Sequence, residues 1–300
     1  IVEEWGHRVR KFGRLTGRVT RFAGTGVAGF SGDLGPASEA RLNHPYGITF
    51  DSEGSLYLSD TQNNRIRRID SDGVITTYAG DGFSRELNQG RWAGDGRQAT
   101  EASFNLPLGI ATDDHGNLFI ADERNHVVRR VDPLGFVSTF AGEVGLGGYN
   151  DYFGDGFPAF RANFNRPAGL AVGHADNLLI VDRVNNRVRN VDASGLLTSF
   201  AGDGFGWDRF TGRFAGDGGP ATLASFYRPA AVTLDSDGNV YISDTSNHRV
   251  RRIDQDGTVS TIAGSGGAGF SGDDGAASTA SLHNPTGLLV DIDGSVLVAD

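Results

Sequence analysis

The stretch RPAAVTLDSDGNVYISDTSNHRVRRIDQDGTVSTIAG, residues 228–264, contains four short apolar segments separated by three turns. The segments are too short for helices and are rich in Val, Ile, Thr and Tyr, a composition that favours strands. Asp-Gly pairs at residues 237–238 and 256–257 stand where antiparallel hairpins would reverse. The stretch therefore predicts a four-stranded antiparallel meander, with strands over 230–234, 239–243, 250–253 and 258–263.

The same pattern recurs five times along the chain, at separations of 62, 60, 62 and 56 residues between the prolines that open it: Pro45, Pro107, Pro167, Pro229 and Pro285. Repetition of a four-stranded unit at this period is typical of a β-propeller. We predict an all-β fold, a propeller of four-stranded blades forming one domain over residues 1–300. The continuous blades are predicted at 45–80, 107–142, 167–202 and 229–264.

The two ends of the chain carry complementary parts of the repeat. Residues 8–24 match the third and fourth strands of the template, and the chain ends at Asp300 after a second strand. Pairing the two ends would give each half its missing hydrogen-bond partners and remove an exposed strand edge. We therefore expect residues 1–24 and 285–300 to form one composite blade, which makes five blades. The alternative is a six-bladed propeller or a segment cut from a longer array.

A second element repeats between the blades. It contains a Gly-Asp pair and, in most copies, a proline followed by alanine, as in SGDLGPASEARL at residues 31–42. An acidic residue followed by proline is a typical helix start. We expect one short helical turn in each linker, capped by the aspartate of the Gly-Asp pair.

Composition excludes several classes of function. The formal net charge of −10 argues against nucleic acid as a partner, because phosphate binding needs a basic surface. No apolar run reaches membrane-spanning length, so no membrane insertion is expected, and the first residues do not form a signal-peptide pattern. The chain has no cysteine, which rules out disulfides and cysteine-ligated metals.

The blade pattern reads P-x-G-[IL], then G-[NS]-[LV]-x-[IVL]-[AS]-D, then N-x-R-[IV]-R-R-[IV]-D, and the spacer between blades reads AG…GDGGPAxxAxL. This pattern resembles the NHL repeat, in particular its bacterial and teneurin-like variety. The resemblance implies a propeller that serves as a protein-, glycan- or RNA-binding platform. A minority of NHL proteins are enzymes, such as the peptidyl-hydroxyglycine lyases, with a metal in the central channel. Such propellers are commonly six-bladed, so a count of five departs from the family pattern.

Aspartate ends the second strand of every blade, and asparagine follows three residues later in the first four. Such side chains hold turns in shape through local hydrogen bonds. The arginine that opens the third strand is placed to pair with that carboxylate. Because the motif repeats in every blade, we interpret it as a fastener of the blade: Asp60, Asp122, Asp182, Asp244 and Asp300, with Arg65, Arg187 and Arg249.

We predict no cofactor, with two metal sites as alternatives. Ca²⁺ requires several carboxylates converging on one point, and each Gly-Asp loop offers only one or two. His44 and His283 flank the first strands of neighbouring blades, and with a carboxylate they could hold a metal at the mouth of the channel.

Three consecutive linkers are longer than the repeat requires and carry aromatic and arginine residues. Loops longer than the fold needs are often functional, and exposed aromatics with arginine are usual anchors of interfaces. We predict a binding surface on this linker face: Arg91, Trp92, Tyr149, Tyr152, Trp207 and Arg209. The competing interpretation is that aromatics such as Phe83, Phe205 and Phe214 fold inward and cover the blade edges.

These observations favour a non-enzymatic recognition platform that binds a protein or a glycan through the linker face. We expect an extracytoplasmic setting, whether secreted, periplasmic or at the cell surface. The first alternative is a metal-dependent lyase or lactone hydrolase that acts in the central channel. The second is an architectural module that works beside neighbouring domains or assembly subunits.

Overall fold

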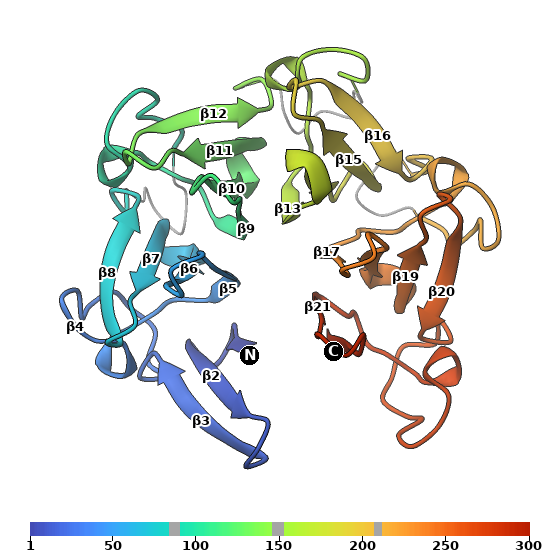
Figure 1. The fold of residues 1–300 in the computed structure, drawn as a ribbon, viewed down its shortest axis with the longest axis horizontal. Coiled ribbons are helices and arrows are strands. Elements are labelled where there is room, and N and C mark those ends of the chain that lie inside the picture. The colour runs from blue at the N-terminus through green and yellow to red at the C-terminus, as the bar shows by residue number, and fades with distance from the viewer. Residues whose placement is uncertain (84–90, 146–152, 207–211) are drawn as a thin grey trace. The chain divides into compact units, whose positions relative to one another are not determined.

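The computed structural model describes residues 1–83, 91–145, 153–206 and 212–300. The chain has the all-β propeller fold that the repeat predicts, with four complete blades and a partial blade at each end (Figure 1). It forms two compact units, Ile1–Phe140 and Ala141–Asp300. The helices of the described part are single 3₁₀ turns, and none of them is long enough to cross a membrane.

Four blades are complete antiparallel sheets whose strands pair in chain order. Their strands are β5 (Pro45–Phe50), β6 (Leu56–Asp60), β7 (Arg65–Ile69) and β8 (Val74–Ala79); β9 (Pro107–Thr112), β10 (Leu118–Asp122), β11 (Val127–Val131) and β12 (Val137–Ala141); β13 (Pro167–Val172), β14 (Leu178–Asp182), β15 (Arg187–Val191) and β16 (Leu197–Ala201); β17 (Val232–Leu234), β18 (Val240–Asp244), β19 (Arg249–Ile253) and β20 (Val259–Ala263).

The first strand of the template, β17, begins at Val232, two residues later than predicted. The hydroxyl of Ser243 accepts the main-chain N–H of Ala231, just before this strand, at 2.7 Å. Ser59 does the same for Gly47 at 2.6 Å. In both blades a serine hydroxyl accepts a main-chain N–H group in place of a carbonyl group of the neighbouring strand. In blade one the strand register shifts at this point.

The terminal sheets hold partial blades. β1 (Val2–Glu3), β2 (Arg8–Gly13) and β3 (Arg18–Ala23) form one sheet, and β21 (Gly287–Val290) pairs with β22 (Val296–Ala299) in another. Glu3 lies opposite Arg8, as Asp60 lies opposite Arg65 in blade one. The sequence therefore begins at the end of a second strand, and not at the third strand as we predicted.

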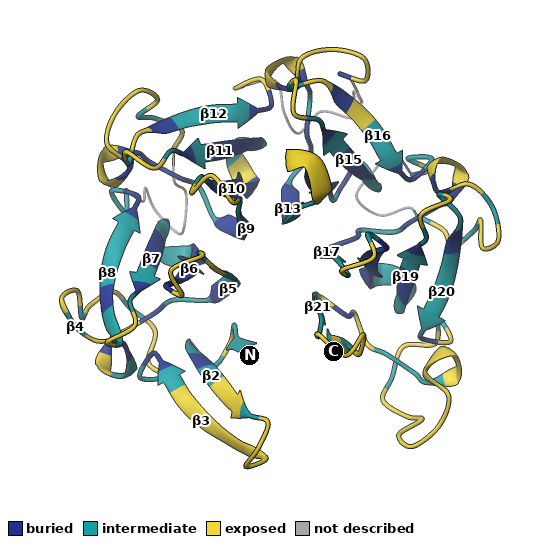
Figure 2. Ribbon diagram, viewed as in Figure 1, coloured by how far each residue is buried: buried dark blue, intermediate teal, exposed yellow. Residues whose placement is uncertain are grey.

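Apolar side chains of successive blades pack face to face and form the core. In the first unit, Val9 and Ala23 of the terminal sheet join Leu42 of the linker and Leu58 and Ile75 of blade one in one cluster. A second cluster joins blade one to blade two through residues that include Tyr57, Ile66, Phe104, Ile110 and Leu118. Figure 2 shows buried residues along the strands and exposed residues at many of the turns. In this unit, burial in one blade therefore depends on the neighbouring blade, as in other repeat folds.

Each linker contains the predicted helical turn, a 3₁₀ helix of three residues: η1 (Ala37–Glu39), η3 (Ala99–Glu101), η5 (Ala159–Arg161), η7 (Ala221–Leu223) and η9 (Ala277–Thr279). The predicted acidic cap is wrong. Pro36 precedes η1 in an extended conformation, without a side-chain cap bond. The carboxylate of Asp33 is engaged elsewhere, because it accepts hydrogen bonds from Arg67 and Thr77.

The remaining short elements complete the chain. β4 (Gly35–Pro36) pairs with β8 and covers part of its edge. Second and third strands are joined in three blades by η2 (Thr61–Asn63), η4 (Glu123–Asn125) and η8 (Thr245–Asn247), and η6 (His174–Asp176) lies between β13 and β14. Each of the three joining turns ends in a left-handed residue: Asn64, His126 and His248.

Joining of the two terminal sheets into one blade stays a prediction, and a cross-link tests it. By the register of the complete blades, Leu297 of β22 would lie opposite Lys11 of β2. Since the chain lacks cysteine, the variant Lys11→Cys/Leu297→Cys offers a single disulfide. Closure predicts an intramolecular bond under mild oxidation, seen as a monomer of altered mobility. Absence of that bond, or formation of disulfide-linked dimers alone, would contradict closure. β1 already pairs with β2 at Val9 and Arg8, and Ile1 exchanges main-chain hydrogen bonds with Arg10, so the joined blade would use β2 from Lys11 onward.

Candidate functional site

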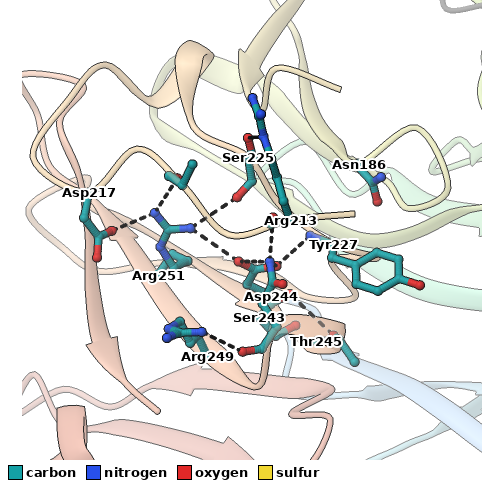
Figure 3. A network of polar contacts seen from close by, with 12 residues as sticks. Asn186, Arg213, Asp217, Ser225, Tyr227, Ser243, Asp244, Thr245, Arg249 and Arg251 are labelled. Carbon is teal, nitrogen blue, oxygen red and sulfur yellow. Dashed lines mark hydrogen bonds and ion pairs between the residues drawn. The ribbon is translucent and has the colours of Figure 1, made fainter. Parts of the chain in front are cut away.

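A buried arginine between two carboxylates is the polar centre of each complete blade. In blade four, Arg251 of β19 has no exposed side-chain surface. Its Nη2 donates to Asp217 Oδ1 at 2.6 Å, and its Nη1 donates to Asp244 Oδ2 at 3.3 Å (Figure 3). The same guanidinium donates to the main-chain oxygens of Ala215 and Ser225. One side chain therefore ties the linker, the second strand and the third strand together.

The aspartate of this centre is itself held on three sides. Asp244 accepts the main-chain N–H of Tyr227 at 2.8 Å and the side-chain amide of Asn247 at 2.9 Å. The other complete blades repeat the arrangement, with the second-strand aspartate, the arginine and the Gly-Asp aspartate in that order: Asp60, Arg67 and Asp33; Asp122, Arg129 and Asp95; Asp182, Arg189 and Asp155. The fastener role that we predicted for the second-strand aspartates fits these contacts.

Burial sets the electrostatics of these carboxyl groups. It raises the pKa of Asp60 and Asp244 to about 6 and that of Asp122 to about 7, and it raises the pKa of Asp182 as well. The hydrogen bonds and the arginine act in the opposite direction. Because the folded pKa lies above the unfolded value, ionising these groups lowers the free energy of unfolding as the pH rises. The arginine limits that loss.

The predicted partner of the aspartates was the first arginine of the third strand, and the structure gives the role to the second. Arg65 donates to the main-chain oxygens of Asn63 and Asp81. Arg249 donates to those of Asn247 and Ser265, and Arg187 to those of Gly202 and Asp203. The first arginine lies at the start of the third strand, close to the next linker, and it therefore binds main-chain carbonyl groups of that linker.

Within each unit, a hydrogen bond that we did not predict joins a blade to the next one. The left-handed residue after the second strand accepts, through its side chain, the main-chain N–H of the residue before the next blade's proline. Asn64 binds Leu106 in this way at 2.9 Å, and Asn186 binds Arg228 at 2.8 Å. His7 accepts from His44 through Nδ1 at 3.2 Å, and His248 accepts from Asn284 at 3.1 Å. The signal in the sequence is a slot that alternates between Asn and His.

His44 and His283, the predicted metal candidates, lie beside these blade-to-blade hydrogen bonds. The ring of His44 packs edge-on against His7 and Trp5, with centroids 4.8 and 4.6 Å apart. The ring of His283 lies 5.9 Å from that of His248, and its main-chain N–H donates to Asp300. Within the described ranges, no three side chains of His, Asp or Glu gather as a metal site would require.

The base of the first long linker is a compact polar cluster on an aromatic ring. The guanidinium of Arg91 lies 4.1 Å above the ring of Phe83, and its Nε donates to the hydroxyl of Ser103 at 3.1 Å. Asp81 accepts from that hydroxyl at 2.6 Å and from the main-chain N–H of Phe83 at 2.8 Å. The cation–aromatic stack is therefore held in place from two sides.

The third long linker repeats this cluster residue for residue. Arg213 lies 4.1 Å above the ring of Phe205 and donates to Ser225 at 2.9 Å. Asp203 accepts from Ser225 at 2.6 Å and from Arg213 at 3.0 Å. We name the two clusters the linker stacks. Of the stack residues, Arg91 is among the predicted contacts and the others are not, although the shared Asp-Gly-Phe and Gly-Arg pattern of the two linkers is visible in the sequence.

Of the six predicted contact residues, Arg91 and Trp92 lie in the described part of the chain. Arg91 keeps 55% of its side chain exposed, and Trp92 is 38% exposed. The Trp92 indole donates to the hydroxyl of Thr139 and lies 5.7 Å from the buried guanidinium of Arg129, so it also covers the blade. The other four lie outside the described residues: Tyr149, Tyr152, Trp207 and Arg209.

Comparison with known proteins agrees with the repeat pattern and the fold. The profile of the teneurin NHL domain matches residues 26–91 and 87–148, and the profile of the NHL repeat matches residues 226–253. The chain is 30% identical over 285 residues to mouse teneurin-4 and 27% identical over 290 residues to the protein SUPPRESSOR OF QUENCHING 1, chloroplastic, of Arabidopsis thaliana. These alignments take in 86% and 94% of this chain but only 10% and 26% of the two relatives.

Among solved structures, a catalytically inactive variant of virginiamycin B lyase from Staphylococcus aureus, crystallised with quinupristin, has the same fold. Its TM-score is 0.52 at 14% identity, over 99% of this chain and 85% of that one. The chain thus belongs to the NHL-repeat β-propellers. Within that class it is similar to the NHL domain of the teneurins.

The two histidine-mediated bonds predict a pH dependence that the asparagine-mediated bonds lack. Nδ1 must be unprotonated to accept a hydrogen bond. Burial, followed by the neighbouring His44 and His283, lowers the pKa of His7 and His248 below 6.5. Their contribution to stability is therefore complete above the unfolded pKa and is lost as the pH falls toward the folded pKa. We expect the variant His7→Asn/His248→Asn to melt within about 2 °C of wild type at pH 7.5 and clearly above it at pH 5.

The converse substitution serves as the matched control. Asn64→His places histidine in the same slot of blade one and should add acid sensitivity to the melting curve. Identical pH profiles of the melting temperature in wild type and in both variants would show that these bonds do not titrate.

Proposed function

We propose that the protein is a non-enzymatic recognition module that binds a protein or a glycan through its linker face. The observation that carries the proposal is the pair of linker stacks. In each, a half-exposed arginine is fixed above an aromatic ring at the base of a long linker. A fixed cation on a flat apolar ring offers contact area at little entropic cost, which suits an interface anchor.

The other features of the linkers support the same proposal. Phe205 is 42% exposed and Phe214 is 38% exposed, so the two rings do not fold fully inward. The competing interpretation, that the linker aromatics only cover the blade edges, explains two of the positions. Trp92 lies over Arg129, and Phe214 lies 3.9 Å from the guanidinium of Arg249. That interpretation does not account for Arg91 and Arg213, whose side chains stay more than half exposed. Membership of the NHL propellers is consistent with protein interaction, and an extracytoplasmic setting is part of the proposal.

The metal-dependent lyase or lactone hydrolase is the second candidate. Its support is the fold shared with virginiamycin B lyase, and likeness at 14% identity concerns the fold alone. An enzyme of this kind needs three metal-competent side chains at one point. Metal content of the purified protein by mass spectrometry separates the candidates, because one tightly held transition metal per chain would favour the enzyme.

The linker stacks predict which variants lose binding. Peptide-display and glycan-array screens with the intact chain supply ligands, whose affinity is then measured for Arg91→Ala and Arg213→Ala. We expect affinity to fall at least about tenfold, since truncating an interface anchor costs more than about 1.4 kcal/mol. The matched control is Arg252→Ala, an arginine at the other end of blade four. Ligands that bind both stack variants as tightly as wild type would disprove the linker-face site.

A further inference from the structure

We propose that the cleft between blades three and four binds a small aromatic cation. The cleft has a volume of about 460 Å³ and lies where the turns from first to second and from third to fourth strand meet. Both blades belong to the second compact unit. Its lining residues are different from those of the linker stacks, so the inference goes beyond the proposed function and does not depend on it.

Blade three lacks an aromatic ring that the other complete blades have. In blade one, Tyr57 and Tyr78 pack edge to face with ring centroids 4.7 Å apart, and in blade two Phe119 and Phe140 do so at 4.8 Å. Blade three has Phe200 on its fourth strand but Leu179 on its second. Leu179 and Phe200 both line the cleft, so the missing ring leaves space beside an aromatic wall.

Blade three also lacks the arginine that accompanies the ring. The cross-strand neighbour of Tyr57 is Arg68, that of Phe119 is Arg130 and that of Tyr241 is Arg252. Leu179 lies opposite Asn190 instead. Asn190 accepts a hydrogen bond at 2.6 Å from Asn177, which lines the cleft. Two large side chains are thus replaced by two short ones at the same place in the blade.

The third departure of blade three from the repeat is the turn between its first and second strands, which lies at the mouth of the cleft. Other blades begin this turn with an aspartate whose Oδ1 accepts two main-chain N–H groups, as Asp235 does in blade four. Blade three has Gly173 there, and Ala175 and Asp176 adopt φ values of 63° and 59°. Left-handed backbone at alanine is costly and is often found at functional sites. His174 lies on this turn and lines the cleft together with Gly238 of blade four, where a Cβ would come 3.4 Å from its ring.

The chemistry of the lining selects the ligand. The deep wall is apolar, formed by Leu179, Val240 and Ile253, all of them buried. The rim contributes the carboxylates of Asp254 and Asp256. None of the described lining residues is Lys or Arg. A ligand that supplies a planar ring to Phe200 and a positive charge to the carboxylates would replace what blade three lacks.

Tryptamine is the probe, because it joins an indole ring to an ammonium group. We expect ligand-observed NMR and calorimetry to give a dissociation constant of about 0.1–1 mM, a usual range for so small a ligand. Tryptophol, its neutral analogue, should bind at least about fivefold more weakly, and Asp256→Asn should reduce that preference.

Leu179→Phe decides the location, because it restores the ring that other blades carry and fills the cleft. We expect it to weaken tryptamine binding at least tenfold while the melting temperature stays or rises. Leu134→Phe, the same substitution at an exposed turn of blade two, is the matched control and should bind as wild type does. Asn190→Arg supplies the missing cation and is the second variant if Leu179→Phe folds poorly.

Two results would overturn the proposal. One is the absence of tryptamine binding up to about 10 mM, well above the expected range. The other is equal binding by wild type and by a folded Leu179→Phe or Asn190→Arg variant.

Discussion

The fold depends on placing one fully buried arginine between two carboxylates in each complete blade. A buried cation without partners is prohibitively costly, so the arginine constrains everything near it. Asp244 must lie at the end of β18, Asp217 must reach in from the linker, and Arg251 must point from β19 toward both. These demands fix the second-to-third-strand turn and the start of the linker together.

The same constraint explains how the blades connect. The linker aspartate cannot cap the 3₁₀ turn that follows it, because the arginine needs it. The turn is entered instead through proline in an extended conformation, as at Pro220 before η7. Blade-to-blade hydrogen bonds that Asn64 and Asn186 accept then position the start of the next first strand. The ion pairs hold each blade to the linker before it, and the apolar clusters fill the space between blades.

Much of this order could be predicted from the sequence, because repetition makes one hairpin pattern visible five times. The strands and the linker turns follow from such patterns. The partner of the second-strand aspartates could not be predicted, because Arg65 and Arg67 are equally plausible by spacing and only side-chain reach separates them. Apart from Arg91, the residues of the linker stacks were not predicted, because Ser103 and Ser225 lie twelve residues from the arginines that bind them. Positions that depart from the repeat indicate what is specific to this protein. Leu179, Asn190 and Gly173 are ordinary residues, and they become informative only by comparison with the residues at the same positions of the other blades.

The most direct test of this account is the free energy of unfolding of Arg251→Met, measured by denaturant titration beside Arg252→Met. The neighbour Arg252 is only partly buried and bonds to Asn239, so it reports the loss of an ordinary arginine. If the buried arginine organises the blade, Arg251→Met costs about 3–5 kcal/mol, because two carboxylates are left facing each other without it. Arg252→Met should cost about 1 kcal/mol or less. Equal, small losses in both variants would contradict the claim that the fold depends on this ion pair.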